Sequence, residues 1–228
     1  MSASAAGLWQ APGGECTELS LKALDVMERV VAQGDAVALI GGKRSLREAI
    51  DPCAAIRLAR VSLQGYHEAR TVAALGGAAD RLGPTRQALE ELSKLRGGSL
   101  DLEIEYADTA IRAAIAAAQD ERAELALLLS HARDLTERLV TRSRRAIWPR
   151  PYNVLAGDLW LEVDRFDDAR AAFERAVKAD ASPLAIVGLS RALVRLGRRD
   201  EACRTLARLP VDAVSLRDAT REEFAECR

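Results

Sequence analysis

The sequence predicts an all-α fold of stacked helical hairpins. Hydrophobic residues make up 49% of the 228 residues and aromatic residues only 4%, so the core must be built mainly from Ala, Leu and Val, which suit helices on balance. Pro52 and Pro84 are 32 residues apart, as are Pro151 and Pro183. Because proline interrupts helices, this spacing marks breaks at the period of a helical repeat. We find no stretch with the alternating pattern of a strand.

The first third of the chain predicts a flexible segment followed by short helices. Residues 1–16 lack a helical pattern, and Thr17 then caps a helix over 17–32 that Gly34 ends. Ser45 and Glu48 form a capping-box pattern before a short segment that Pro52 ends. Helical periodicity resumes over 54–64 and 67–82. Together, residues 17–145 are expected to form a region of degenerate helical hairpins.

The remaining helices are separated by glycine and proline. Gly97-Gly98 ends a helix over 85–95, and two longer helices follow over 102–118 and 120–144. Residues 146–212 are expected to form two repeat units, with helices over 152–163, 167–179, 183–196 and 199–209. Residues 213–228 are expected to form a polar capping helix over 216–227, with Ser215 as its N-cap.

The two units between residues 151 and 209 align on themselves with a shift of 33 residues, which pairs Ala169 with Ala202, Phe173 with Leu206, and Ala176 with Leu209. This pattern resembles the tetratricopeptide repeat (TPR), in which small residues stand where two helices cross and large residues pack beside them. The matching residues are Gly157, Trp160, Ala169, Phe173 and Ala176 in the first unit, and Ser190, Leu193, Ala202, Leu206 and Leu209 in the second. A fainter copy ends near Leu95, and there is no resemblance before about residue 66.

The TPR resemblance implies a right-handed solenoid that binds a protein or peptide along its concave face. That face is lined by the first helix of each hairpin, which here carries Val154, Asp158 and Leu161 in one unit and Val187, Arg191 and Arg195 in the next. One TPR subclass grips a terminal carboxylate with Lys and Asn at positions that correspond to Val154, Asp158 and Val187. That clamp is missing from this sequence, so the resemblance does not imply binding of chaperone tails.

An arginine-rich segment precedes the first clear unit. Five arginines and no acidic residue occur between Arg138 and Arg150, and Arg145, Trp148 and Tyr152 are its candidate contact residues. The arginines would suit the negative end of a helix dipole, or they would form with the aromatic residues a surface for an anionic peptide group. The net charge of −1 disfavours nucleic acid as the partner.

Catalytic, metal and cofactor sites are not expected. The glycine pair before Lys43 lacks the first glycine of a phosphate loop and has Arg44 where Ser or Thr is required. His67, His131 and Cys53 have no evident catalytic partners, and Asp167-Asp168 suits the start of a helix. The sequence therefore favours a non-enzymatic protein.

The four cysteines leave two interpretations open. They are either small buried thiols or two disulfides, Cys16–Cys53 and Cys203–Cys227, in an exported protein. No apolar run is long enough to span a membrane. We expect a cytoplasmic protein as the sequence stands, or a periplasmic or exported one if Met1 follows a removed signal peptide.

The expected function is that of an adaptor or assembly factor that holds a partner segment in the concave groove. Two alternatives remain open: an exported, envelope-associated accessory protein with structural disulfides, and a helical protein that binds a small ligand. Homo-oligomerisation also stays open, and the partner cannot be identified from these residues.

Overall fold

The structure, a computed structural model, describes residues 52–75, 79–142, 150–179, 182–210, 213, 220, 222–225 and 227. Within these ranges the chain is all-α and contains no strand, so the predicted fold class is confirmed. Eight α-helices and one short 3-10 helix are described: α3 (Pro52–Ala74), η3 (Ala79–Leu82), α4 (Gly83–Lys94), α5 (Asp101–Ala118), α6 (Arg122–Thr141), α7 (Tyr152–Glu162), α8 (Phe166–Ala179), α9 (Pro183–Arg195) and α10 (Arg199–Leu206).

Several predicted elements lie outside the described residues. They are the flexible segment 1–16, the helix over 17–32 and the segment that begins at Ser45. Most of the predicted capping helix over 216–227 is also outside, although Thr220, residues 222–225 and Cys227 are described.

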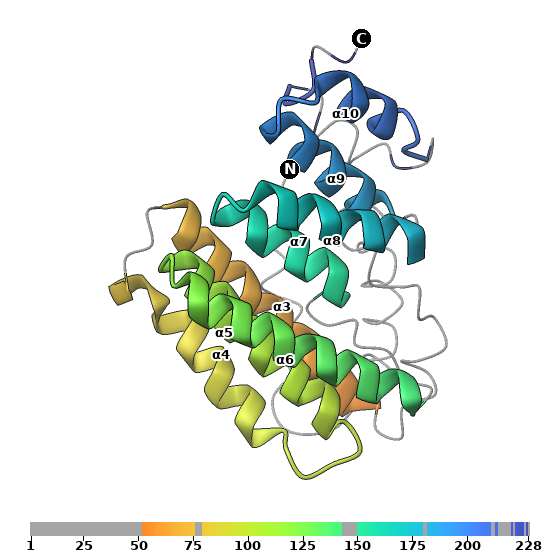
Figure 1. Cartoon of the computed structure of the whole chain (residues 1–228). Helices are drawn as coiled ribbons and strands as arrows, with labels where there is room; N and C mark the ends of the chain where they lie inside the picture. Colours follow the sequence, from red (N-terminus) through yellow and green to blue (C-terminus); the bar gives the residue numbers. More distant parts are fainter. Residues whose placement is uncertain are drawn as a thin grey trace, which may run out of the picture.

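The helices pack pairwise in chain order. Each odd-numbered helix packs on the helix that follows it, which gives the pairs α3–α4, α5–α6, α7–α8 and α9–α10. The pairs are joined to one another because α3 packs on α5, α5 on α7, and α9 on both α7 and α8. Figure 1 shows the result, in which the helices follow one another from α4 at the lower left to α10 near the C-terminus at the top.

Helix α3 differs from the prediction. Two helices were expected over 54–64 and 67–82, but the chain forms one continuous helix from Pro52 to Ala74. The gap between the expected helices contains Gly65, and a glycine inside a helix costs about 1 kcal/mol. In the folded protein Gly65 is a close-packing position, because a Cβ added there would lie 2.8 Å from both Ala88 of α4 and Ile111 of α5. Packing against two neighbouring helices therefore accounts for a glycine that the local pattern treats as an interruption.

Helix α5 is the centre of the larger core cluster. Alanine and isoleucine cover most of its surface, and they are almost completely buried between α3, α4, α6 and α7. Small side chains let neighbouring helix axes approach closely, so contact area is gained without large rings. The low aromatic content of the chain follows from this kind of packing.

The two last pairs meet around one aromatic ring. Phe173 of α8 is fully buried, and it lies between Gly157 of α7 and Gly188 of α9. A Cβ on Gly157 would lie 2.6 Å from the Cζ atom of Phe173, and one on Gly188 would lie closer still to the same ring. Glycine at both positions is therefore what allows α7, α8 and α9 to pack together.

The two turns of the C-terminal pairs have the same backbone geometry. Asp164, between α7 and α8, has φ 58°, and Gly197, between α9 and α10, has φ 76°. These residues are 33 positions apart, the shift that aligns the two units in the sequence. The left-handed conformation suits glycine and is tolerated by aspartate.

Candidate functional site

An open cavity of about 730 Å³ lies between α3, α7 and α9, and we call it the α3–α7–α9 groove. One wall comes from the C-terminal half of α3, another from α7 together with Arg150, and a third from the first two-thirds of α9. Its lining residues are His67, Arg70, Thr71, Ala73, Ala74, Leu75, Arg150, Asp158, Glu162, Leu184, Val187, Gly188, Arg191 and Thr220. The groove thus combines apolar side chains with charges of both signs.

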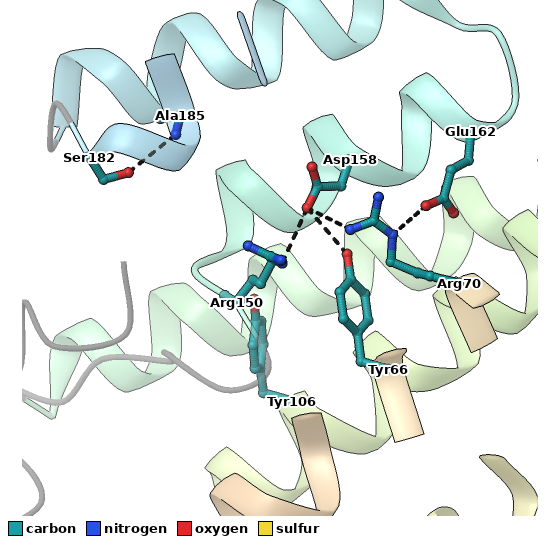
Figure 2. A network of polar contacts seen from close by, with 8 residues as sticks. All are labelled: Tyr66, Arg70, Tyr106, Arg150, Asp158, Glu162, Ser182 and Ala185. Atoms are coloured by element: carbon teal, nitrogen blue, oxygen red, sulfur yellow. Dashed lines mark hydrogen bonds and ion pairs between the residues drawn. The ribbon is translucent and has the colours of Figure 1, made fainter. Parts of the chain in front are cut away.

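Asp158 is the centre of a charged network on the wall formed by α7. Its Oδ2 atom lies 3.4 Å from Nη1 of Arg70 and 3.3 Å from Nε of Arg150. Nε of Arg70 also donates a hydrogen bond to Oε1 of Glu162, one turn further along α7. Figure 2 shows the two arginines converging on Asp158 from opposite sides, while Arg70 also reaches Glu162. The network fastens α3 to α7 across the groove.

Two buried tyrosines support this network from beneath. The Tyr66 hydroxyl donates to Oδ2 of Asp158 at 3.5 Å, and the Tyr106 hydroxyl donates to the backbone carbonyl of Arg150 at 2.6 Å. The guanidinium groups of Arg70 and Arg150 lie 5.6 Å and 6.0 Å from the centre of the Tyr66 ring. Burial, reinforced by the charge of Asp158, raises the pKa of Tyr66 far above its ordinary value. Tyr66 therefore stays a neutral hydrogen-bond donor at physiological pH.

The surroundings of Glu162 disfavour its ionised form. Burial raises the pKa of the Glu162 carboxyl above its ordinary value of 4.5, although Arg70 opposes the shift. Its Oε2 atom is buried and has no hydrogen-bond partner among the described residues. A desolvated carboxylate oxygen without a partner favours the protonated acid.

This raised pKa predicts a pH-dependent stability. The folded state binds the Glu162 proton more tightly than the unfolded chain does, so the stabilisation is fully present below about pH 4. It is lost as the pH rises through the raised pKa, with a slope of up to about 1.4 kcal/mol per pH unit. Urea denaturation from about pH 4 to about pH 7 should therefore show the stability of the wild-type protein falling relative to that of Glu162→Gln.

A wild-type stability that stays constant or rises relative to that of Glu162→Gln over this pH range would contradict this assignment. The same measurement on Glu137→Gln, which removes an exposed carboxylate from α6, controls for the general effect of charge removal.

Two of the predicted partner-binding arginines are paired within the chain. Arg191 donates three hydrogen bonds of 2.9–3.0 Å to the carboxylate of Glu223. Arg195 pairs with Asp164 at 2.7 Å, and its guanidinium lies 4.4 Å from the centre of the Phe166 ring. Arg191 is also a lining residue of the groove, whereas Arg195 is not.

The other predicted contact residues have different surroundings. Val154 is only 3% exposed and packs in the core between α7, α8 and α9, where Leu161 packs half-buried against the same cluster. Val187 is 1% exposed and lies at the floor of the groove. Tyr152 is half-buried against the larger core cluster. Arg145 and Trp148 lie outside the described residues.

The groove brings together Asp158, Val187 and Arg191 from the prediction and adds a wall that sequence reasoning missed. This wall consists of residues on α3, among them His67, Arg70 and Thr71. The only available signal was their helical spacing, since His67, Arg70 and Thr71 recur at intervals of three and four residues. Their position opposite α7 depends on how α3 crosses the later helices.

The residues predicted to pack the repeats lie at helix crossings. Ala169, Phe173 and Ala202 are fully buried, and Ala176 is 6% exposed. Trp160 and Leu206 are half-buried against core clusters. Gly157 is buried and faces the Phe173 ring.

The described residues contain one disulfide, Cys203–Cys227, so this half of the disulfide interpretation holds. Cys16 and the side chain of Cys53 lie outside the part that can be described. Disulfides are typical of proteins from oxidising compartments.

The fold and the groove define an all-helical protein with pairwise-packed helices and a charged, partly apolar groove on one side. Comparison of the chain with protein-family models, with curated proteins and with solved structures finds no match. Among the described residues, no helix is long and apolar enough to cross a membrane, and no cluster of His, Cys, Asp and Glu has the size of a metal site.

Proposed function

We propose that this protein is a non-enzymatic adaptor or assembly factor, a TPR-like right-handed solenoid that binds a segment of a partner protein in the α3–α7–α9 groove. The observation that carries the proposal is the groove itself, an open cavity of about 730 Å³ lined by the first helix of three of the four helix pairs. In a TPR-like arrangement these helices form the concave, partner-binding face. Two observations support that arrangement: the last two units align in sequence with a shift of 33 residues, and the left-handed residues of their turns, Asp164 and Gly197, are also 33 residues apart.

The lining of the groove suits a peptide segment. Ala74, Leu75 and Leu184 offer apolar contacts, and Leu75 is 61% exposed. The charged network around Asp158 offers hydrogen-bonding groups in the same groove. A groove with apolar pockets beside fixed polar groups is typical of segments that bind as a helix or an extended strand.

The groove is also held rigid before any partner arrives. Arg70 joins α3 to α7 through Asp158 and Glu162, and Phe173 locks α7 to α9 through Gly157 and Gly188. Binding to a preformed surface loses little conformational entropy, so a modest contact area is sufficient for useful affinity.

Filling the groove with large side chains should abolish partner binding. Thr71→Trp combined with Ala74→Trp places two indoles in the groove from exposed positions of α3, so the core is not altered. We expect recovery of the partner in quantitative co-purification to fall by about tenfold or more, because central contacts dominate interface energy.

Leu127→Trp is the matched control for this experiment. Leu127 is 68% exposed on α6 and is not a lining residue of the groove. The control variant should recover the partner as the wild-type protein does. Equal loss, or equal recovery, in both variants would overturn the proposal, provided that circular dichroism shows unchanged helix content.

A further inference from the structure

A segment of the chain's own C-terminus is seated at one end of the α3–α7–α9 groove. Thr220 lines the groove and is 2% exposed, and Phe224 is 6% exposed. The backbone N–H of Phe224 donates to the carbonyl of Thr220, and that of Cys227 donates to the carbonyl of Phe224, both at 3.0 Å. These bonds keep the segment in a compact turn rather than in an extended arm.

Glu223 connects this turn to the groove. It accepts all three hydrogen bonds that Arg191 donates, in the two-pronged geometry that arginine forms with carboxylates. The two side chains remain 44% and 42% exposed. An exposed pair of this kind is worth about 1 kcal/mol or less, so another carboxylate can replace Glu223 at little cost.

The charges of the groove indicate which chemistry would replace it. Among the described lining residues, Arg70 and Arg150 pair with Asp158 and Glu162, whereas Arg191 pairs with Glu223. Once Glu223 leaves, one positive charge in the groove is uncompensated. Electrostatic complementarity then favours a segment that brings a carboxylate to Arg191.

We propose that Arg191 is the docking point for a carboxylate of an acidic partner segment, and that Glu223 occupies this point as an internal stand-in until the partner displaces it. This inference rests on the proposed function of the groove and names the class of its partner. The docking point lies on α9, one of the helices that the sequence assigns to the concave face.

The disulfide affects how strongly Glu223 competes with a partner carboxylate for Arg191. Cys203 belongs to α10 and Cys227 lies four residues after Glu223, so the bond keeps Glu223 close to α9. A short tether raises the effective concentration of the internal carboxylate, to about the millimolar range for flexible tethers. A partner peptide must therefore compete harder in the disulfide-bonded protein than in a protein without the bond.

A labelled peptide tests this proposal in the full-length protein. The probe is a fluorescein-labelled synthetic peptide with the sequence of residues 218–228 carrying Cys227→Ser, and binding is read by fluorescence anisotropy. We expect it to bind a protein with Cys203→Ser, Cys227→Ser and Glu223→Gln at least about tenfold more tightly than it binds the wild type. Adding Arg191→Gln should remove this gain. A probe in which Gln replaces two of its three glutamates, Glu222 and Glu223, should bind about tenfold more weakly.

Glu223→Gln alone, which retains the disulfide, should give an intermediate gain and covers the case in which loss of the disulfide harms folding. Equal binding by the wild type and the variants, or binding that is indifferent to Arg191→Gln, would overturn the proposal. The groove-filling experiment leaves Arg191 intact. Partner loss there, together with failure of the acidic probe here, would reject acidic docking and leave the groove as the binding site.

Discussion

Replacing Phe173 with alanine should lower the free energy of unfolding by about 3–5 kcal/mol. The ring is fully buried where α7, α8 and α9 meet, and the glycines on either side have no side chains that could fill the space. The cost therefore combines the lost transfer free energy of the ring with that of a cavity that cannot collapse. Urea denaturation followed by circular dichroism measures it.

Phe166→Ala is the matched control for this prediction. Phe166 is on the same helix but is half-buried beside Arg195, so its removal should cost about 1 kcal/mol or less. Comparable losses for the two variants would show that the Phe173 ring does not lock the three helices together.

A double-mutant cycle tests the close packing directly. Gly188→Ala should cost about 1–3 kcal/mol in the wild type, because the added Cβ meets the Phe173 ring. In a Phe173→Leu background the cost should be at least about 1 kcal/mol smaller, since the obstructing ring is gone. Gly83→Ala, where a Cβ would meet nothing within 4 Å, controls for the general effect of alanine in a helix. Additive effects would contradict the predicted contact.

Asp158→Ala should destabilise the protein by about 3–4 kcal/mol, the lower side of the range for broken buried ion pairs. The substitution leaves the guanidinium groups of Arg70 and Arg150 facing each other without their shared carboxylate. The side chain of Arg150 is only 12% exposed and that of Arg70 is 30% exposed, so water compensates them incompletely. Chemical denaturation at pH 7 measures the loss.

The control for Asp158 is a carboxylate in an exposed pair. Asp134 lies 3.8 Å from Arg133, and both side chains are more than half exposed. Asp134→Ala should change stability by less than about 0.5 kcal/mol. If Asp158→Ala were as mild as this control, the network would not be what joins α3 to α7.

The C-terminal helices were predictable because their signals are local. The helix over 183–196 was expected from Pro183 and its apolar spacing, and the structure has it from Pro183 to Arg195, with Ser182 accepting a hydrogen bond from the backbone of Ala185. Caps and apolar periodicity act within about one or two helical turns, so the sequence displays them directly. The sequence also indicated that Gly157 and Phe173 lie where two helices cross, because a small and a large residue stand at the positions that match the repeat pattern.

Helix α3 and the groove wall it forms were not predictable in this way. The expected helices over 54–64 and 67–82 leave a gap at Gly65, whose close neighbours Ala88 and Ile111 lie 23 and 46 residues further along the chain. Arg70 gave no sign of its role, because Asp158 is 88 residues away. No local pattern records which distant side chains will become neighbours.

The sequence by itself determined an all-α chain, most helix boundaries and the small residues at the crossings, since all of these follow from short-range backbone and side-chain preferences. Only the tertiary structure decided that α3 runs unbroken, that Asp158 gathers two arginines, and that Arg191 already holds a carboxylate of its own chain. The reason is physical: desolvation and charge pairing act between surfaces that come together only when the helices pack.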